Sequence, residues 1–276
     1  MNHLKRAAMV FRAVFIKNAL EYIRYPANFI FSLFMPVVWT LPIYFLIRSF
    51  APDGTSAGLM SWTGSADFYG YFLIGMVVAY INMSIFWNTG FSLKRLMDIG
   101  MLETTWGLPI GKTTYILAES LFSVLRLTYE MTLVVIIFRF LFGMRLPAGF
   151  GAMIPWFIPF FVLMYGLGIG FAALVLLVKD ANTMADSASF LINGVTGTQN
   201  PPQVFPRFLL TIAMLIPITY FLDMLRAGSL GITPLLPLAL EGAIVALSSL
   251  VIPIGGFLFF RYTDKRCRKT GSLHVH

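Results

Sequence analysis

Apolar runs long enough to cross a lipid bilayer recur along this sequence. A helix of about 20 residues matches the roughly 30 Å hydrocarbon core of a bilayer. Hydrophobic residues make up 58% of the 276 residues and charged residues only 12%, whereas a soluble domain carries about 25% charged residues. Because hydrocarbon offers the backbone no hydrogen-bond partners, such runs predict helices. The sequence therefore predicts an all-α integral membrane protein with little material for a soluble catalytic domain.

The charged and reactive residues argue against several functions. The net charge of +8 fits the surplus of Lys and Arg on the cytoplasmic loops of membrane proteins, which favours a membrane role over nucleic-acid binding. The single cysteine, Cys267, cannot form an internal disulfide. The three histidines, His3, His274 and His276, are all terminal. We therefore expect no catalytic residue, no metal site and no cofactor bound by this chain.

Three parts of the chain differ in pattern. Residues 1–26 have apolar residues at helical spacing and charged residues on the other face, which predicts an amphipathic helix lying in the membrane interface. Residues 27–261 contain the apolar runs and form the predicted transmembrane domain. Residues 262–276 are rich in Lys and Arg and form a predicted basic tail on the cytoplasmic side.

Six crossings are expected within the transmembrane domain. The clear spans are at residues 27–50, 68–90, 114–142, 151–178 and 235–261, with a polar loop at 51–67 and a short connection at 179–186. The fifth run, 187–197, is too short to cross alone, and three prolines crowd residues 198–206 before apolar residues resume at 207–220. We therefore expect a fifth span that is followed by a broken or re-entrant outer segment.

The distribution of Lys and Arg predicts the orientation. With six spans and both termini in the cytoplasm, 14 Lys and Arg residues fall on the inner side and five on the outer side. This excess on the inner side is the pattern that sets the orientation of helical membrane proteins. We expect a multi-pass protein of the cytoplasmic (inner) membrane.

Residues 94–113, KRLMDIGMLETTWGLPIGKT, form the longest interruption of mixed charge between two apolar runs. This segment cannot lie in hydrocarbon, where its charges and irregular backbone would be unsatisfied. It is expected to form a structured loop at the membrane face. The chain has no GxxxxGK[ST] motif, so it cannot hydrolyse a nucleotide by that route alone.

Ionisable residues inside predicted spans are candidates for function. Glu119, Arg126 and Glu130 are seven and four residues apart, which places them along one face of the third span, and Arg126 can pair with Glu130. They form either a structural ion pair facing the bundle, which we favour, or a polar lining for a transported substrate. Glu241 lies near the outer end of the last span.

Two motifs carry a family resemblance. The segment GMLETTWGLPIGKTTYILAESL, with Gly100, Leu102, Glu103, Pro109 and Ile110, resembles the signature of type-2 ABC exporter permeases. The segment IPITYFLDMLRAG resembles the element that follows the fifth span in that family. In the second motif the matching residues are Pro217, Thr219, Tyr220, Asp223 and Arg226, whereas Ile216 replaces the usual Asn.

This resemblance implies a membrane half-transporter without a motor of its own. A second permease chain, alike or different, and a separate ABC ATP-binding subunit that holds ATP and Mg²⁺ would be its partners, with membrane lipid around it and no nucleic acid. Residues 1–26 would be the family's elbow helix, and residues 95–107 its coupling helix. The implied ATPase-coupling residues are Arg95, Asp98, Gly100, Leu102, Glu103 and Pro109; the implied outer gate contains Pro217, Tyr220, Asp223 and Arg226.

The expected function is therefore transport and not catalysis. The main hypothesis is the permease subunit of an ATP-driven exporter that moves a hydrophobic or amphipathic substrate, such as a drug, natural product or lipid. Export of a lipid-linked polysaccharide is an alternative within the family. A secondary transporter is the alternative from another class, and it would predict inverted repeats with matching broken helices in both halves.

Overall fold

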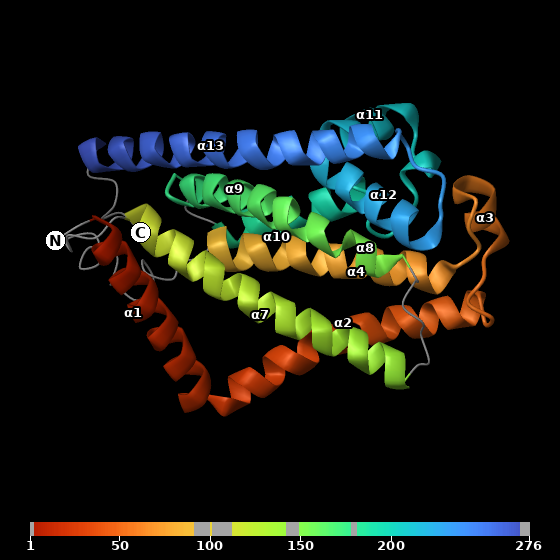
Figure 1. Ribbon diagram of the computed structural model, residues 1–276, viewed down its shortest axis with the longest axis horizontal. Helices are drawn as coiled ribbons and strands as arrows, with labels where there is room; N and C mark the ends of the chain where they lie inside the picture. Colours follow the sequence, from red (N-terminus) through yellow and green to blue (C-terminus); the bar gives the residue numbers. More distant parts are fainter. Residues whose placement is uncertain (1–2, 91–99, 101–111, 142–148, 178–180, 271–276) are drawn as a thin grey trace.

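The computed structural model describes residues 3–90, 100, 112–141, 149–177 and 181–270, which form an elongated bundle of helices (Figure 1). The described residues contain no β-strand, and five of their helices are long and apolar enough to cross a membrane. A sixth is obtained if a bent pair of helices counts as one span. The predicted all-α membrane class is confirmed.

In chain order the elements are α1 (His3–Arg24), α2 (Pro26–Phe50), α3 (Ala57–Thr63), α4 (Phe68–Ile85), the π-helix η1 (Phe86–Gly90), α7 (Lys112–Leu141), α8 (Phe150–Met153), the 3₁₀ turn η2 (Ile154–Trp156), α9 (Phe157–Val175), α10 (Ala181–Val195), the 3₁₀ turn η3 (Pro202–Val204), α11 (Arg207–Leu215), α12 (Pro217–Leu230) and α13 (Leu238–Thr270). The first turn of α1 and the last turn of α13 lie at the same end of the bundle (Figure 1). We call this the terminal end.

Helices α1 and α2 meet at a sharp corner. Pro26 is the first residue of α2, where its missing N–H removes no helical bond and its fixed φ suits a helix start. In Figure 1 the two helices form a V whose arms diverge from this corner. On α1, Val14 and Asn18 are buried, whereas Ile16 and Ile23 are exposed. Its apolar surface is therefore only partly covered by the rest of the protein.

Helices α4, α9 and α12 form the centre of the apolar core. Val78 and Ile85 of α4 have no exposed surface. The rings of Phe160 on α9 and Phe221 on α12 stack with centroids 3.9 Å apart and planes 6° apart, and both are fully buried. Because burial of apolar surface stabilises the folded state in proportion to area, these side chains anchor α12 to the spanning helices.

Helices α9 and α13 approach each other closely enough for their backbones to touch. A Cβ atom built on Gly256 of α13 would overlap the carbonyl oxygen of Gly166 on α9, and one built on Gly166 would lie 2.6 Å from the backbone of Pro253. Small residues at helix crossings permit this approach in membrane proteins. Figure 1 shows the two helices side by side.

The connection between α10 and α13 is broken into short helices. Helix α10 has 15 residues, or about 22 Å at 1.5 Å per residue, which is shorter than the hydrocarbon core. Helices α11 and α12 then meet at an angle of 93°. The break falls at Ile216, whose backbone is extended because the Pro217 ring disfavours a helical conformation in the preceding residue.

Two elements differ in extent from the expected pattern. The loop expected at 51–67 contains helix α3, which begins at the N-cap Ser56 and ends at Gly64 with φ +78°. The helix has only seven residues, which is too short for helical periodicity to stand out in a loop rich in Gly, Ser and Thr. The last helix continues past the expected end at Arg261 as far as Thr270, since Lys and Arg are good helix formers and Cys267 packs near the Leu176 carbonyl oxygen.

We predict that Gly256→Val destabilises the protein by about 1 to 3 kcal/mol, because the added methyl groups must push α13 away from the α9 backbone. The measurement is the thermal unfolding midpoint of the purified protein in detergent. Gly255→Val is the matched control, since a Cβ at Gly255 meets nothing within 4 Å. Equal midpoints for the two variants would contradict the backbone contact.

Candidate functional site

The predicted ATPase-coupling residues fall almost entirely outside the described part of the chain. Gly100 is the exception, and its φ of +66° lies in the left-handed region that glycine adopts at little cost. The remaining residues of this prediction lie outside the described residues, and their coupling role stays a prediction: Arg95, Asp98, Leu102, Glu103 and Pro109.

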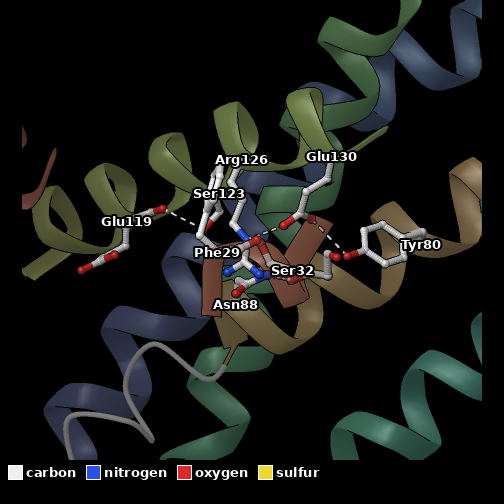
Figure 2. Close-up of polar contacts among 9 residues, drawn as sticks. Phe29, Ser32, Tyr80, Asn88, Glu119, Ser123, Arg126 and Glu130 are labelled. Atoms are coloured by element: carbon white, nitrogen blue, oxygen red, sulfur yellow. Dashed lines mark hydrogen bonds and ion pairs between the residues drawn. The ribbon is translucent and has the colours of Figure 1, made fainter. Parts of the chain in front are cut away.

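The ionisable residues on α7 belong to two separate networks. Glu119 accepts hydrogen bonds from the Lys17 ammonium and from Asn18 Nδ2, the latter at 2.8 Å, and thereby ties α7 to α1. About two helical turns further along α7, Arg126 Nε donates to Glu130 Oε1 at 2.8 Å (Figure 2). The three residues therefore share a helix but not one polar network.

The Arg126–Glu130 pair also connects α7 to α4. The Tyr80 hydroxyl on α4 donates to Glu130 Oε2 at 3.1 Å, as Figure 2 shows. Only 1% of the Glu130 side chain is exposed, compared with 31% of Arg126. A buried carboxylate is tolerated only when its oxygens are paired and hydrogen-bonded, and both oxygens of Glu130 have a donor.

A cavity of about 170 Å³ opens beside Arg126, and we call it the α1–α7 cavity. Four elements line it: α1, α2, η1 and α7. Its lining residues are Asn18, Glu21, Tyr22, Ser32, Asn88, Glu119, Phe122, Ser123 and Arg126. Burial raises the pKa of the Tyr22 phenol above its usual value, so Tyr22 is neutral at physiological pH and offers a ring and a hydroxyl.

The sequence analysis did not identify most of this lining. Glu119 and Arg126 stood out because charges are rare in spans, but Tyr22, Ser32 and Ser123 are ordinary on a helix. The signal that could have identified them is helical spacing: Glu119, Ser123 and Arg126 follow each other at four and three residues. Which helix faces this stripe is a property of tertiary packing.

The predicted outer-gate residues lie on α12, at and around a fully buried arginine. Arg226 Nη1 donates to the Gly197 carbonyl oxygen at 2.7 Å, and Nη2 donates to that of Thr198 at 2.8 Å. Its Nε donates to the Tyr71 carbonyl oxygen at 3.2 Å, and the guanidinium carbon lies 3.5 Å from the centre of the Tyr71 ring. We call this cluster the Arg226 node.

The other residues of the predicted gate hold the backbone nearby. Pro217 starts α12, and the Tyr220 hydroxyl donates to the Met214 carbonyl oxygen across the α11–α12 bend at 2.6 Å. Asp223 Oδ2 accepts from the Leu235 N–H at 2.6 Å in the connection to α13. These contacts fix the bend and the connection, while any gating role stays a proposal.

Glu241 also binds the backbone of the connection between α12 and α13. It lies in the first turn of α13, has no exposed surface, and its Oε1 accepts from the Leu236 N–H at 3.0 Å. Asp223 and Glu241 thus bind consecutive backbone N–H groups. Within the part of the chain that the structure describes, no group of three or more His, Cys, Asp or Glu residues is placed to hold a metal ion.

Comparison with known proteins identifies one family. The family model described as ABC-2 type transporter matches residues 9–230. The match runs from α1 to the last residue of α12 and so covers the α1–α7 cavity and the Arg226 node. A search of the curated proteins found no match.

We predict that Arg126→Ala lowers the free energy of unfolding by about 2 to 4 kcal/mol, because it leaves the buried Glu130 carboxylate without its cation. Adding Glu130→Gln should recover much of that loss, since the neutral amide needs no counter-charge. Stability is measured by denaturant titration in detergent micelles. A double variant no more stable than Arg126→Ala would show that the pair is not what stabilises this region.

We predict that Arg226→Lys destabilises the protein by about 2 to 4 kcal/mol, although the charge is kept. A lysine ammonium is a point donor and cannot reproduce a planar fork that reaches carbonyl oxygens on two segments. Arg207→Lys, at the exposed start of α11, is the matched control in the same titration. Similar losses for both variants would argue against the Arg226 node.

Proposed function

The chain belongs to the ABC-2 type transporter family, and we propose that it is the membrane-spanning subunit of an ATP-driven exporter. The family domain is a membrane transport subunit and not a catalytic one, and the family implies an ATP-binding partner in general. In the proposal, the energy for transport comes from ATP and Mg²⁺ held by that separate subunit, and a second permease chain completes the pathway.

The observation that carries the proposal is the family match over α1 to α12 in a chain of apolar, membrane-length helices. We infer six crossings, with α10 and the bent pair α11–α12 together supplying the fifth crossing and a broken outer segment. Both termini are then cytoplasmic, which agrees with the excess of Lys and Arg on that side. In this arrangement α1 is the elbow helix in the interface of the inner membrane.

The proposed contact with the ATPase is residues 94–113. This segment joins η1 to α7, which begins at the terminal end of the bundle (Figure 1). Because α7 carries both the Glu119 contact to α1 and the Glu130 contact to α4, a push at its start would reach both helices. The Arg226 node is proposed to hold the outer segment that closes the exit.

The proposed substrate is hydrophobic or amphipathic. The observation in favour is the α1–α7 cavity, which has charged, polar and aromatic residues in its wall and lies beside the exposed Phe29, whose ring is 5.7 Å from that of Tyr22. Drugs, natural products and lipids share this amphipathic character. Export of a lipid-linked polysaccharide is kept as the alternative within the family, since it too has a lipid end.

We predict that this chain, purified from its native membrane with a C-terminal tag, brings with it a soluble subunit that contains a phosphate-binding loop. Glu103→Ala should release that subunit and abolish substrate-stimulated ATP hydrolysis, because the variant removes a charge from the proposed docking segment. The readouts are the stoichiometry of the purified complex and its ATPase rate.

Asp53→Ala is the control for this experiment. It removes one exposed carboxylate from the loop that precedes α3, at the opposite end of the bundle, and it should leave both readouts unchanged. Purification of the chain alone under the mildest detergents would contradict the exporter and favour a secondary transporter. Retention of the ATPase by Glu103→Ala would instead contradict only the docking role of Glu103.

A further inference from the structure

We propose that the α1–α7 cavity binds the zwitterionic head group of an amphipathic lipid, with a phosphate at Arg126 and an ammonium at Glu21. The inference deepens the proposed function, on which it rests for the role of the lipid as a substrate. Binding itself is a property of this chain alone. The argument below uses the size, the charges and the walls of the cavity.

The cavity is large enough for the head group of a lipid but not for the whole molecule. A cavity of about 150 Å³ is known to hold a benzene molecule, whereas pockets for whole drug-sized ligands measure about 300 to 1,000 Å³. At about 170 Å³, the α1–α7 cavity takes a phosphate with a short amine but not a complete lipid. The rest of the ligand must lie outside it.

Arg126 supplies the anion-binding end. Its Nε is bonded to Glu130, whereas its two Nη groups have no hydrogen-bond partner among the described residues. Figure 2 shows Arg126, Ser32 and Asn88 gathered on one side of α7, and all three line the cavity. A guanidinium with two donor groups on one edge matches two phosphate oxygens. Asn88 Nδ2 donates one N–H to the Ser84 carbonyl oxygen and has a second to offer, whereas the Ser32 hydroxyl already donates to the Phe29 carbonyl oxygen and forms part of the wall.

Glu21 supplies the cation-binding end. Glu119 is also in the wall, but both of its oxygens accept hydrogen bonds from α1. Glu21 is exposed, and the described residues provide no ion-pair partner for its carboxylate. An anionic ligand would be repelled by Glu21 and a cationic one by Arg126, whereas a zwitterion complements both.

Aromatic rings form part of the cavity wall. The rings of Tyr22 and Phe122 have centroids 5.9 Å apart, and both residues line the cavity. Ring faces attract ammonium groups. The Phe29 ring lies 5.7 Å from that of Tyr22 and is 37% exposed, so it continues the apolar wall outward. Acyl chains attached to the head group would follow this surface toward the hydrocarbon.

The test compares two soluble probes with the same acyl chains. Binding of dihexanoyl-phosphatidylethanolamine and dihexanoyl-phosphatidylglycerol to the purified chain is measured by native mass spectrometry. We expect the ethanolamine probe to bind more tightly, because only it carries the ammonium. Glu21→Gln should lower the affinity for the ethanolamine probe by about two- to fivefold, the range of an exposed ion pair. It should not lower the affinity for the glycerol probe.

Filling the cavity provides the second arm. Ser32→Leu places a branched side chain in the cavity and should lower the affinity for the ethanolamine probe by about tenfold or more. Ser49→Leu is matched to it, because Ser49 lies on the same helix, is exposed, and also donates its hydroxyl to a preceding carbonyl oxygen. Ser123→Leu and Thr128→Leu form the equivalent pair on α7. Thermal unfolding midpoints show whether each variant is folded.

Three results would overturn the proposal: equal affinities for the two probes, equal losses for the cavity and control variants, or no loss at all. ATP-dependent movement of the ethanolamine probe by the complete complex would identify it as cargo. Undiminished binding without movement would assign the cavity to a resident bilayer lipid with the same head-group chemistry. If no ATPase co-purifies but the two probes and the variants still differ in binding, the exporter proposal is contradicted and the head-group site is supported.

Discussion

The bundle depends on a guanidinium that has almost no contact with solvent. Arg226 is 1% exposed, and such a group is stable only if its donors are satisfied. Its bonds reach the carbonyl oxygens of Gly197 and Thr198 just beyond α10, and that of Tyr71 in α4. The Gly197 and Thr198 carbonyls lie beyond the end of α10, where helical partners are missing. One side chain therefore joins three elements that are distant in the sequence.

The two arginines discussed above serve different ends because their surroundings differ. Arg226 is enclosed, and each of its three nitrogens donates a hydrogen bond to a backbone oxygen, so the backbone holds this group in place. Arg126 is balanced by Glu130 through Nε alone and is 31% exposed, so it retains donors on the side of the cavity. Charge inside a membrane domain is costly in both places. Burial and the number of nitrogens bonded to the protein, and not the residue type, give Arg226 a structural role and leave Arg126 able to bind a ligand.

The sequence was sufficient for the class of the protein but not for its site. Long apolar runs predict membrane helices because hydrocarbon leaves the backbone no other choice, and the four-residue spacing brings Arg126 to Glu130 through helix geometry alone. The α1–α7 cavity was not predictable in this way, because Tyr22, Ser32 and Asn88 meet only after α1, α2 and η1 pack on α7. Helix α3 was missed because seven residues give too little periodicity to read.

The contact between Gly166 and Gly256 has a mechanical consequence. Most helix pairs are separated by a layer of side chains, whose rotamers can adjust and absorb a small displacement. Where α9 and α13 meet backbone to backbone, that compliant layer is absent. Helix α13 has 33 residues, or about 50 Å, so it exceeds the hydrocarbon core of roughly 30 Å. A displacement applied to the protruding end of α13 would therefore move α9 as well, and the two helices would behave as one rigid body.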